Sequence, residues 1–510
     1  MFVLKLIAIA VSCIFFFVIV ARVIFPLPET PERIDSAALP VSDSAPIVRA
    51  IRNRLNAHTG QTGIGALDDG ANAFAARMIL AEAAVSSIDA QYYIWQNDLT
   101  GTLLLEALQR AAQRGVRVRL LLDDNGTSGL DAELASLDAH PNVEVRLYNP
   151  FNLRRFKMLS YGFDFFRLNR RMHNKSFTVD GAATILGGRN IGDQYFGTGP
   201  TALYLDLDVL AVGKVVPEVA ADFDKYWAAP AVHPAGPILG LASGGDPISD
   251  RLERFQSTPQ MAEYRKIIEA SDIVAALSAG SFDLEWTKAL LVSDDPVKGL
   301  GAVPTEDLLA VRLRKAVGRI ESRFDGISPY FVPGAAGVKA FSKLESEGVQ
   351  VRMLTNALEA TDVLPVHAGY AKRRRDLLAV GVEMFELQKQ LTIRIPPERV
   401  GPFGSSGTSL HAKTFAVDGK RVFVGSFNFD PRSTRLNTEM GLLIESSSMA
   451  RIIHASFDRK LDGVAWQVEL RDDALTWRNN SETTISEPGT TWIKSVLLKV
   501  IGWLPVEWLL

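Results

Sequence analysis

Two stretches of the chain, 238 positions apart, carry the same order of polar residues. The first, MHNKSFTVDGAATILGGRN, spans residues 172–190, and the second, LHAKTFAVDGKRVFVGSFN, spans residues 410–428. Each has a histidine, then a lysine after one intervening residue, an aspartate after four, a glycine after six and an asparagine after two. Five residue types at identical spacings are too specific to recur by chance, so the pair indicates an internal duplication.

The duplication extends well beyond these two stretches. Strand-like and helix-like segments alternate in both halves, with apolar residues at the spacings typical of each. In the first half they are SIDAQYYIW (87–95), GTLLLEALQRAAQRG (101–115), VRVRLLLDD (116–124) and VEVRLYNP (143–150). In the second half the corresponding places are taken by ISPYFVP (327–333), GVKAFSKLESEGVQVRMLTN (337–356) and GVEMFEL (381–387). We therefore predict an α/β fold of two similar lobes related by a pseudo-twofold axis, with the active site at their interface.

The rest of the chain completes the predicted domain organisation. A segment rich in proline and serine follows the apolar N-terminus, and a stretch without a counterpart separates the two halves. The predicted order is a membrane anchor (1–26), a linker (27–48), a first lobe (49–234), a helical insert (235–300), a second lobe (301–470) and a C-terminal tail with an interfacial helix (471–510).

The N-terminal segment is nearly all apolar from Phe2 to Phe25, with Lys5 and Arg22 as its only charges. At ~1.5 Å per residue, a helix of this length reaches across a bilayer core of ~30 Å. No small-residue cleavage site closes the run, so we predict an uncleaved transmembrane anchor. Processing of the segment, for example at a weak lipoprotein-like box before Cys13, is the alternative.

Composition excludes several classes of protein. The chain has 510 residues and a formal net charge of −3, which does not favour a dedicated nucleic-acid binder. Its single cysteine rules out an internal disulfide and a cysteine metal cluster. Its seven histidines include no pair at the spacing of a helical zinc motif. We therefore expect neither a metal nor another cofactor.

Each repeated motif brings a histidine and a lysine to one face of an extended segment, because residues i and i+2 of a strand point the same way. His173 lies beside Lys175, and His411 beside Lys413. An imidazole beside an ammonium group is a poor structural pairing, but it suits the binding of a phosphate. Further N–H donors for phosphate oxygens are offered by Asn190, Asn428 and the loop GPFGSSGTS (401–409).

These motifs resemble the phospholipase D superfamily, whose hallmark is the doubled pattern. The phrases IDAQYYIW, GVRVRLLLDDNG, NRRMHNKSFTVDG, VHAGYAKRRRDLL and SLHAKTFAVDGKRVFVGSFNFDPRS further resemble its bacterial cardiolipin synthases, over roughly residues 50–510. The resemblance implies a phosphatidyltransferase that moves a phosphatidyl group from a donor phospholipid to phosphatidylglycerol through a phosphohistidine. It implies six catalytic residues, namely His173, Lys175, Asp180, His411, Lys413 and Asp418.

The resemblance also implies different roles for the two histidines. It makes His173 the nucleophile and His411 the general acid and base, although the near-symmetry of the motifs leaves this assignment reversible. The two copies differ in that Gly188 stands where the second copy has Ser426, and we expect Ser426 to support the substrate phosphate.

Two further acids are candidates for orienting the histidines, since each imidazole needs a carboxylate on its second ring nitrogen. Asp206 in LYLDLDVLAVG and Glu439 in LNTEMGLLIES follow their motifs at matching places, and Asp208 lies close behind Asp206 on the same strand face. Charges at a strand edge are the alternative reading of these acids. Asp180 and Asp418 each precede a glycine, so they suit a turn better than a contact with substrate.

Two segments suggest contact with a lipid surface. FNLRRFKMLSYGFDFFRLNRR (151–171) mixes aromatic and basic residues, which suits an anionic membrane, a partly buried loop or single-stranded nucleic acid. We predict the membrane and no nucleic acid. TTWIKSVLLKVIGWLPVEWLL (490–510) places tryptophan and aliphatic residues on one helical face, which predicts an interfacial helix or one docked on its own core.

Three other functions stay open from the sequence. A phospholipase D that releases phosphatidic acid needs the same motifs, because only exclusion of water separates transfer from hydrolysis. A nuclease of the same superfamily and a non-catalytic lipid-binding protein are the other two. The sequence leaves the donor head group, the oligomeric state and any partner protein undetermined.

Overall fold

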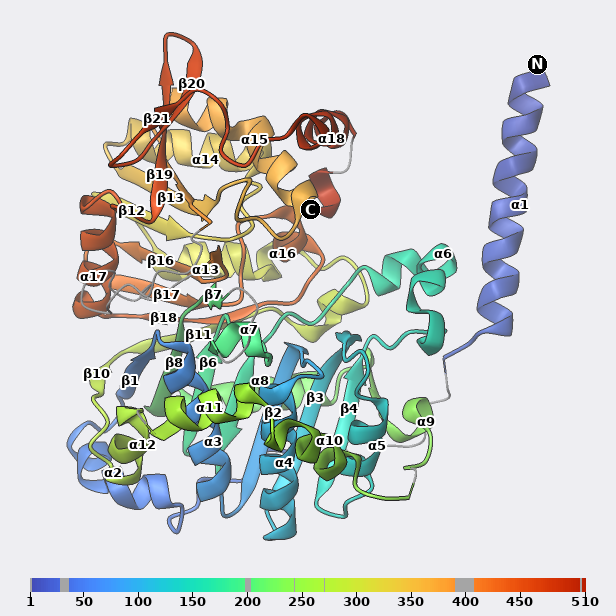
Figure 1. Cartoon of the computed structure of the whole chain (residues 1–510), viewed down its shortest axis with the longest axis vertical. Coiled ribbons are helices and arrows are strands. Elements are labelled where there is room, and N and C mark those ends of the chain that lie inside the picture. The colour runs from blue at the N-terminus through green and yellow to red at the C-terminus, as the bar shows by residue number, and fades with distance from the viewer. Residues whose placement is uncertain are drawn as a thin grey trace.

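The computed structural model consists of two lobes, each built around a large mixed β-sheet (Figure 1). The structure describes residues 2–27, 36–197, 203–242, 244–269, 271–389, 408–504 and 507–510. The lower lobe in Figure 1 holds the first motif and the upper lobe holds the second, so the predicted pair of α/β lobes is confirmed.

The sheet of the first lobe has nine strands in the described chain, in the order β10-β1-β8-β6-β5-β2-β3-β4-β9. Its strands are β1 (Thr62–Leu67), β2 (Ser87–Ile94), β3 (Arg117–Gly126), β4 (Val143–Tyr148), β5 (Ser176–Val179), β6 (Ala183–Gly187), β8 (Asp208–Gly213), β9 (Val232–Pro234) and β10 (Glu285–Thr287). The parallel pairs β2–β3 and β3–β4 lie toward its β9 edge.

The sheet of the second lobe repeats this plan, in the order β11-β18-β17-β16-β12-β13-β14-β19-β20-β21. Its strands are β11 (Ala289–Ser293), β12 (Arg323–Ile327), β13 (Gln350–Asn356), β14 (Glu383–Leu387), β16 (Lys413–Val417), β17 (Arg421–Gly425), β18 (Met440–Ile444), β19 (Ala465–Arg471), β20 (Ala474–Arg478) and β21 (Thr483–Thr484). Parallel pairing again joins β12, β13 and β14. ISPYFVP, predicted to correspond to the strand at 87–95, contributes only its first residue to β12.

Helices cover both faces of the first sheet because successive strand residues point to opposite sides. Leu120 and Leu122 of β3 pack with the helices α3 (Gly70–Ala83), α4 (Leu99–Gln113) and α5 (Asp131–Asp138). Leu121 points the other way and packs against α8 (Val216–Trp227).

The remaining helices lie outside these layers. In the first half they are α1 (Phe2–Ile24), α2 (Pro46–Ala57), η1 (Arg154–Phe156), α6 (Lys157–Leu168), α7 (Asp193–Phe196), α9 (Gly236–Leu239), α10 (Pro247–Gln256), α11 (Pro259–Glu269) and α12 (Asp272–Ser278). In the second they are η2 (Pro296–Gly299), η3 (Thr305–Asp307), α13 (Leu309–Val317), α14 (Gly334–Ser346), α15 (Leu364–Ala379), α16 (Pro431–Arg435), α17 (Ser447–Asp458), α18 (Trp492–Trp503) and η6 (Glu507–Leu509).

The segment between the lobes is helical over α9–α12 but also contains strands. β10 pairs with β1 of the first lobe, and β11 pairs with β18 of the second. The segment thus ties the edges of the two sheets together. Periodicity alone did not identify these strands, because each has only three to five residues.

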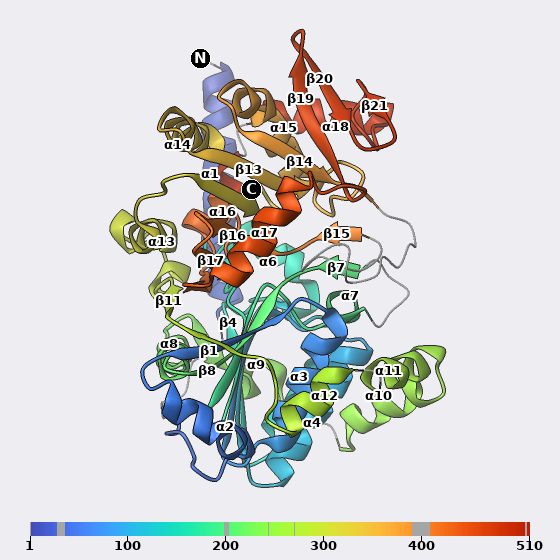
Figure 2. The same cartoon turned by 90° about the vertical axis from the view of Figure 1, so that its left-hand side faces the viewer.

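A shared apolar core joins the lobes. Leu186 and Val209 of the first lobe pack in one cluster with Val424, Met440 and Leu442 of the second. In addition, a short parallel pair, β7 (Leu203–Leu205) with β15 (Thr408–Leu410), links the two lobes through their backbones (Figure 2). The interface therefore has the continuous packing of a single folded body, which fixes the position of one motif against the other.

The N-terminal helix α1 projects from the side of the molecule (Figure 1). Its base is attached to α6, where Arg22 donates to the Phe163 carbonyl at 2.9 Å and pairs with Asp164 at 3.0 Å. Among the described residues, none of the helices combines the length and the apolar character that crossing a bilayer requires.

Candidate active site

The two motif histidines meet at the lobe interface because each is tied by its backbone to the opposite lobe. The His173 N–H donates to the Thr438 carbonyl at 2.9 Å, and the His411 N–H donates to the Leu205 carbonyl at 2.8 Å. Each histidine therefore lies beside the strand that carries the opposite lobe's acid.

The orienting acids are exchanged between the lobes. His173 Nδ1 lies 2.8 Å from Glu439 Oε2, and His411 Nδ1 lies 2.5 Å from Asp206 Oδ2. All four side chains are buried. The sequence identified both acids as candidate partners of the histidines without assigning either acid to one histidine, and the structure pairs each acid with the histidine of the opposite lobe.

The two acids differ in protonation because the neighbouring cations outweigh the effect of burial on the pKa at only one of them. Burial raises the pKa of Glu439 to about 7, against the opposing effect of Lys175. Burial also acts to raise the pKa of Asp206, but His411 and Lys413 outweigh it and lower that pKa to about 2. Asp206 is therefore a carboxylate at neutral pH, whereas Glu439 lies near its titration point.

Both histidines are held neutral. Burial and the nearby Lys175 and Lys413 lower the pKa of His173 well below its usual value. Burial and Lys413 lower the pKa of His411 to about 4, although Asp206 opposes them. A neutral imidazole that donates from Nδ1 to a carboxylate keeps the lone pair of Nε2 for other chemistry.

The two motif lysines complete the cationic centre. Lys175 Nζ donates to the His173 carbonyl at 2.6 Å, and Lys413 Nζ lies 3.1 Å from His411 Nδ1. Both are nearly fully buried, which lowers the pKa of Lys175 to about 7 and of Lys413 to about 8. Buried ammonium groups without a full carboxylate partner are a receptor for an anion.

The asparagines and Ser426 differ in their contacts. Asn190 is held by two hydrogen bonds, accepting from the Ile94 N–H at 3.2 Å and donating one of its two amide hydrogens to the Tyr195 hydroxyl at 3.0 Å. The buried Oδ1 of Asn428 has no hydrogen-bond partner in the described chain. Ser426 donates to Glu439 Oε2 at 2.5 Å, so it supports the acid.

The structure explains why Gly188 stands where the second copy has Ser426. A Cβ at Gly188 would lie 2.1 Å from Asp206 Oδ1. No side chain fits there, so Asp206 approaches the backbone. Among the described motif side chains that could share it, Asp206 is hydrogen-bonded only to His411. In the second lobe, Ser426 fills the corresponding space and shares Glu439 with His173.

Asp180 and Asp418 lie at turns away from the histidines. Asp180 accepts from the backbone N–H groups of residues 85–87 at 2.7–3.1 Å, and Asp418 from those of residues 321–323 at 2.8–3.2 Å. Both have positive φ, near 54° and 53°, the conformation that an aspartate before glycine tolerates. These two members of the implied catalytic set therefore hold the ends of motif strands.

Further buried groups position the motifs. Asp123 accepts from the Met172 N–H at 2.8 Å and pairs with Arg171 at 2.9 Å, next to His173. In the second lobe, Asn356 bonds the backbone of Leu410, beside His411, at 2.8 and 3.1 Å. The sequence places both residues at the ends of buried strands, but only the fold brings them to the motifs.

Two other predicted features lie elsewhere. Asp208 pairs with Arg77 at 2.8 Å inside the first lobe rather than with a motif histidine. The loop predicted to cradle phosphate, 401–409, lies outside the described residues except at its last two positions.

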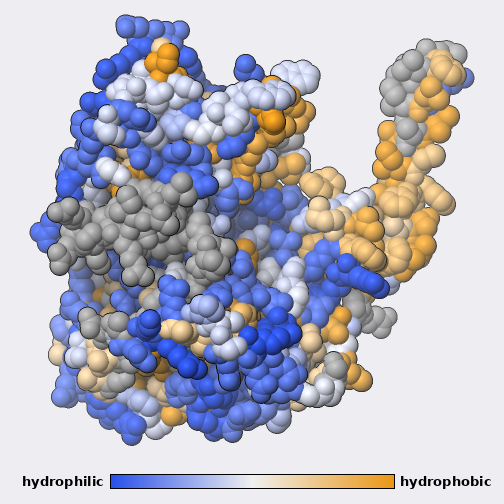
Figure 3. All heavy atoms as spheres, in the orientation of Figure 1, coloured by the Kyte–Doolittle hydropathy of each residue, from blue (hydrophilic) through white to orange (hydrophobic). Residues whose placement is uncertain are grey.

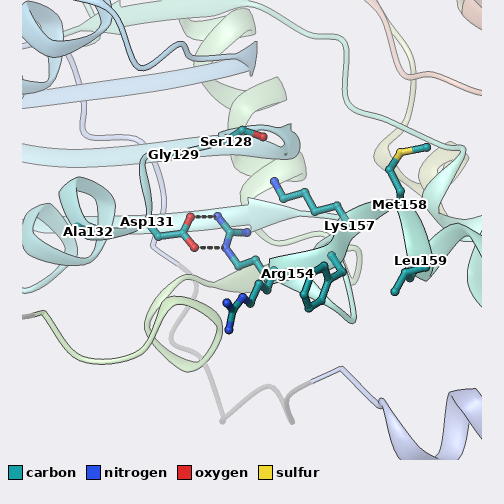
Figure 4. Close-up of a pocket in the computed structure, with 10 residues that line it drawn as sticks. Ser128, Gly129, Asp131, Ala132, Arg154, Lys157, Met158 and Leu159 are labelled. Atoms are coloured by element: carbon teal, nitrogen blue, oxygen red, sulfur yellow. Dashed lines mark hydrogen bonds and ion pairs between the residues drawn. The ribbon is translucent and has the colours of Figure 1, made fainter.

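The basic and aromatic segment 151–171 borders a pocket of its own. This pocket, of about 740 Å³, is lined by residues of α5, η1 and α6 and of the loop before α5 (Figure 4). Within it Arg154 pairs with Asp131 at 2.7 Å, and Lys157 lies 3.5 Å from Asp124. Arg154 and Lys157 are thus already paired with carboxylates, whereas the third cation of the pocket, Arg155, lies over the Phe156 ring, and none of the motif residues lines the pocket.

Comparison with known proteins agrees with this geometry. The chain matches the family described as "Cardiolipin synthase, PLD-like domain" over residues 78–227 and 313–461, once in each lobe. It is 48% identical over 472 residues to cardiolipin synthase C of Escherichia coli (strain K12), covering 91% of this chain and 99% of that protein. Cardiolipin synthase A of Pseudomonas entomophila is 26% identical over 400 residues, covering 77% of this chain and 68% of that protein.

Among solved structures, phosphatidylserine synthase of Haemophilus influenzae Rd KW20 is similar in fold. It superposes with a TM-score of 0.56 at 14% identity and covers 91% of this chain and 100% of that one. At this identity the likeness concerns the fold alone.

Proposed function

The chain belongs to the cardiolipin synthase family of phospholipase D-like proteins, and we propose that it transfers a phosphatidyl group from a donor phospholipid to phosphatidylglycerol. One observation carries the proposal. Two neutral histidines, each oriented through Nδ1 by the opposite lobe's acid, flank a buried cationic centre. The family match supports the reaction class, and the geometry supports the division of labour below.

In the first step, His173 Nε2 attacks the phosphorus of the donor. The bond between phosphorus and the head-group oxygen breaks, and His411 gives that oxygen a proton. Lys175 and Lys413 balance the negative charge on the non-bridging oxygens, with Asn190 and Asn428 as further amide donors. The anionic phosphodiester offsets the charge of the two lysines, which favours the protonated His411 that this step requires.

In the second step, His411 takes a proton from a hydroxyl of phosphatidylglycerol. The resulting alkoxide attacks phosphorus, the bond from His173 to phosphorus breaks, and cardiolipin leaves. Splitting one difficult displacement into two easier ones is the benefit of a covalent intermediate. Water in place of the alcohol gives phosphatidic acid, which is the competing hydrolase function.

The contacts of the two acids support these roles. The Asp206 carboxylate stabilises a positive charge on His411, as an acid–base residue needs. Glu439 is shared with Ser426 and titrates near neutrality, so it holds His173 in position while leaving it uncharged. An uncharged imidazole is the nucleophilic form.

We also propose that the protein works at the inner membrane, anchored by α1. Three groups of exposed apolar side chains support this, and Figure 1 places their elements on the same side of the molecule. On α1 the exposed residues include Phe16, on α6 Met158 and Phe166, and on α18 Trp492 and Trp503. Figure 3 shows apolar surface along α1 and around α6 next to hydrophilic surface. The segment 151–171, which contains α6, is rich in arginine, and apolar and basic residues together suit an anionic bilayer.

The division of the chain stays part of the proposal. It runs from an anchor (1–26) and a linker (27–48) through a first lobe (49–234), a connecting segment (235–300) and a second lobe (301–470) to a membrane-contacting tail (471–510). Both lobes are needed for one active site, so neither is expected to act alone.

The test is production of cardiolipin in cells that lack their own cardiolipin synthases. We would express the wild type, His173→Ala and, as a control, His58→Ala, and follow phospholipids by mass spectrometry. Cardiolipin with the wild type and the control but not with His173→Ala is the expected result. A rise in phosphatidic acid without cardiolipin would identify a phospholipase instead.

A further inference from the structure

A large apolar cavity lies in the second lobe beside the catalytic centre. Its volume is about 700 Å³, within the range of cavities that hold small ligands. Its inner wall is formed by the rings of Phe415, Phe427 and Phe429, and its sides by α13 and the start of α14.

In the first lobe, a buried arginine takes the position equivalent to one of these phenylalanines. Arg189 stands 238 positions before Phe427 and is buried, donating to the carbonyls of Leu67 at 2.7 Å and Asp206 at 2.6 Å. The helix α3, beside it, has fourteen residues, whereas the corresponding α13 has nine. The wall of the cavity is therefore specific to the second lobe and is not a feature of the repeated unit.

The cavity wall is made by the segments that carry the second motif. Phe415 follows Lys413 by two residues on β16, and Phe427 and Phe429 flank Asn428. Asp430, which also lines the cavity, lies within electrostatic reach of both Lys413 and Glu439. In the described chain, none of the motif side chains lines the cavity, which therefore adjoins the cationic centre across the segment 427–430.

The outer rim of the cavity is continuous with the apolar surface of the tail. Trp508 lines the cavity, is 47% exposed and lies in η6, which follows α18. The rim is fixed in place because Lys372 pairs with Glu507 at 3.5 Å and Arg432 donates to the Leu509 carbonyl at 3.2 Å. In Figure 1 the C-terminus lies beside α16 and below α18.

We infer that this cavity binds one acyl chain of the phospholipid whose phosphate is held between His173 and His411. The inference rests on the proposed function and adds a lipid-tail site to it. The aromatic wall excludes water from the side of Asn428, and the rim at Trp508 lets the chain pass to the membrane surface at α18. An apolar chain gains about 0.8 kcal/mol for each buried methylene, so such a site contributes strongly to substrate binding.

The experiment uses the full-length protein in vesicles of phosphatidylethanolamine and phosphatidylglycerol in which both phospholipids carry a photoreactive diazirine at the end of one acyl chain, so that the donor is labelled whichever of the two it is. Labelled peptides are mapped by mass spectrometry in the wild type, in Ala340→Phe and in Ala221→Phe. Ala340 lines the cavity, whereas Ala221 is an exposed residue of α8 outside it. Thermal unfolding and labelling of α18 show whether each variant is folded and bound to the membrane.

We expect labelling of peptides that carry Phe415, Phe427 or the start of α14, reduced about fivefold or more by Ala340→Phe and unchanged by Ala221→Phe. Filling the space of about two methylenes corresponds to roughly tenfold weaker binding of a long chain. In the cells described above, cardiolipin made by Ala340→Phe is expected to carry shorter acyl chains than that made by the wild type.

Labelling confined to α1, α6 and α18, with cardiolipin still formed, would overturn the acyl-chain site while leaving the proposed function intact. Labelling of the cavity in a wild type that forms no cardiolipin would do the reverse, because the lipid-tail site would stand and the transferase would not. Equal labelling and equal chain lengths in Ala340→Phe and Ala221→Phe would also overturn the site.

Discussion

The two halves of the catalytic centre share one motif but hold their histidines differently. His411 has a partner of its own, the ionised Asp206, which fits against Gly188 because no side chain intervenes. His173 shares Glu439 with Ser426, and burial keeps the pKa of that acid near neutrality. Duplication thus supplied two equivalent histidines, and the difference between glycine and serine separates their chemistry.

The exchange of acids also explains why the lobes depend on each other. Each motif histidine is hydrogen-bonded by its backbone and by its ring to residues of the opposite lobe. A single lobe would leave the imidazole without its orienting carboxylate and the buried lysine without a counterion. Both lobes together are therefore needed for activity.

The largest expected effect comes from removing either histidine. His173→Ala and His411→Ala should each lower the rate of cardiolipin formation by about a thousandfold or more, because both steps need both groups. Phospholipid analysis of purified variants in mixed micelles provides the measurement. A variant that kept a tenth of the wild-type rate would show that its histidine is dispensable.

The next effect separates the two acids. Asp206→Asn should lower kcat about a hundredfold or more, because His411 loses the charge that stabilises its protonated form. Glu439→Gln should cost only about tenfold, since Glu439 is needed for orientation and the amide still accepts the Nδ1–H bond. Steady-state kinetics of the two variants tests this order, and equal losses would mean that the two half-sites do not differ.

A smaller effect concerns pH and the two lysines. Their pKa values of about 7 and about 8 lie below the usual value, so the ammonium groups are lost as pH rises from 6 to 9. Binding of sulfate, whose charge is constant over this range, should weaken about tenfold or more, as calorimetry would show. The fall in sulfate affinity should occur in two steps, one for each lysine. Lys175→Met should abolish the step at lower pH, and Lys413→Met should abolish the step at higher pH. Affinity independent of pH in the wild type would contradict the anion site.

The smallest effect on catalysis is expected at the turn aspartates. Asp180→Ala should lower the free energy of unfolding by about 3 kcal/mol, because Asp180 is buried and its loss leaves the N–H groups of residues 85–87 without an acceptor. Asp418→Ala should cost about 1–2 kcal/mol, since Asp418 is half-buried and water replaces part of the loss. In both variants the folded fraction should keep kcat within about threefold. Denaturant titration together with kinetics provides the check. A large loss of kcat in fully folded protein would show that these aspartates take part in catalysis.

Much of this arrangement is predictable from the sequence. The repeated motif and its spacing predict two α/β lobes, and matching positions identify Asp206 and Glu439 as candidate partners of the histidines. Asp208 was placed close behind Asp206 on the strand, yet the structure uses it to bind Arg77. Alternation along a strand says which face a side chain takes, but not what another segment brings to that face.

The exchange of acids between the lobes could not be predicted from the sequence, for a related reason. Duplication shows which residues are equivalent. It does not show whether equivalent residues contact their own lobe or the opposite lobe. The choice depends on the backbone bonds from His173 to Thr438 and from His411 to Leu205, which join residues more than 200 positions apart. The buried residues Asp123 and Asn356, which position the motifs, depend on the same long-range packing.

The covalent intermediate tests the central claim most directly. We would mix His411→Ala with a phospholipid whose head group is p-nitrophenol, a leaving group that needs no acid, then quench the reaction and map the modified peptide. The account predicts one equivalent of p-nitrophenol and a phosphatidyl group on the peptide that carries His173. The adduct should be absent from His173→Ala. An adduct on the His411 peptide of His173→Ala, with none on His173, would reverse the roles of the two half-sites and contradict the account.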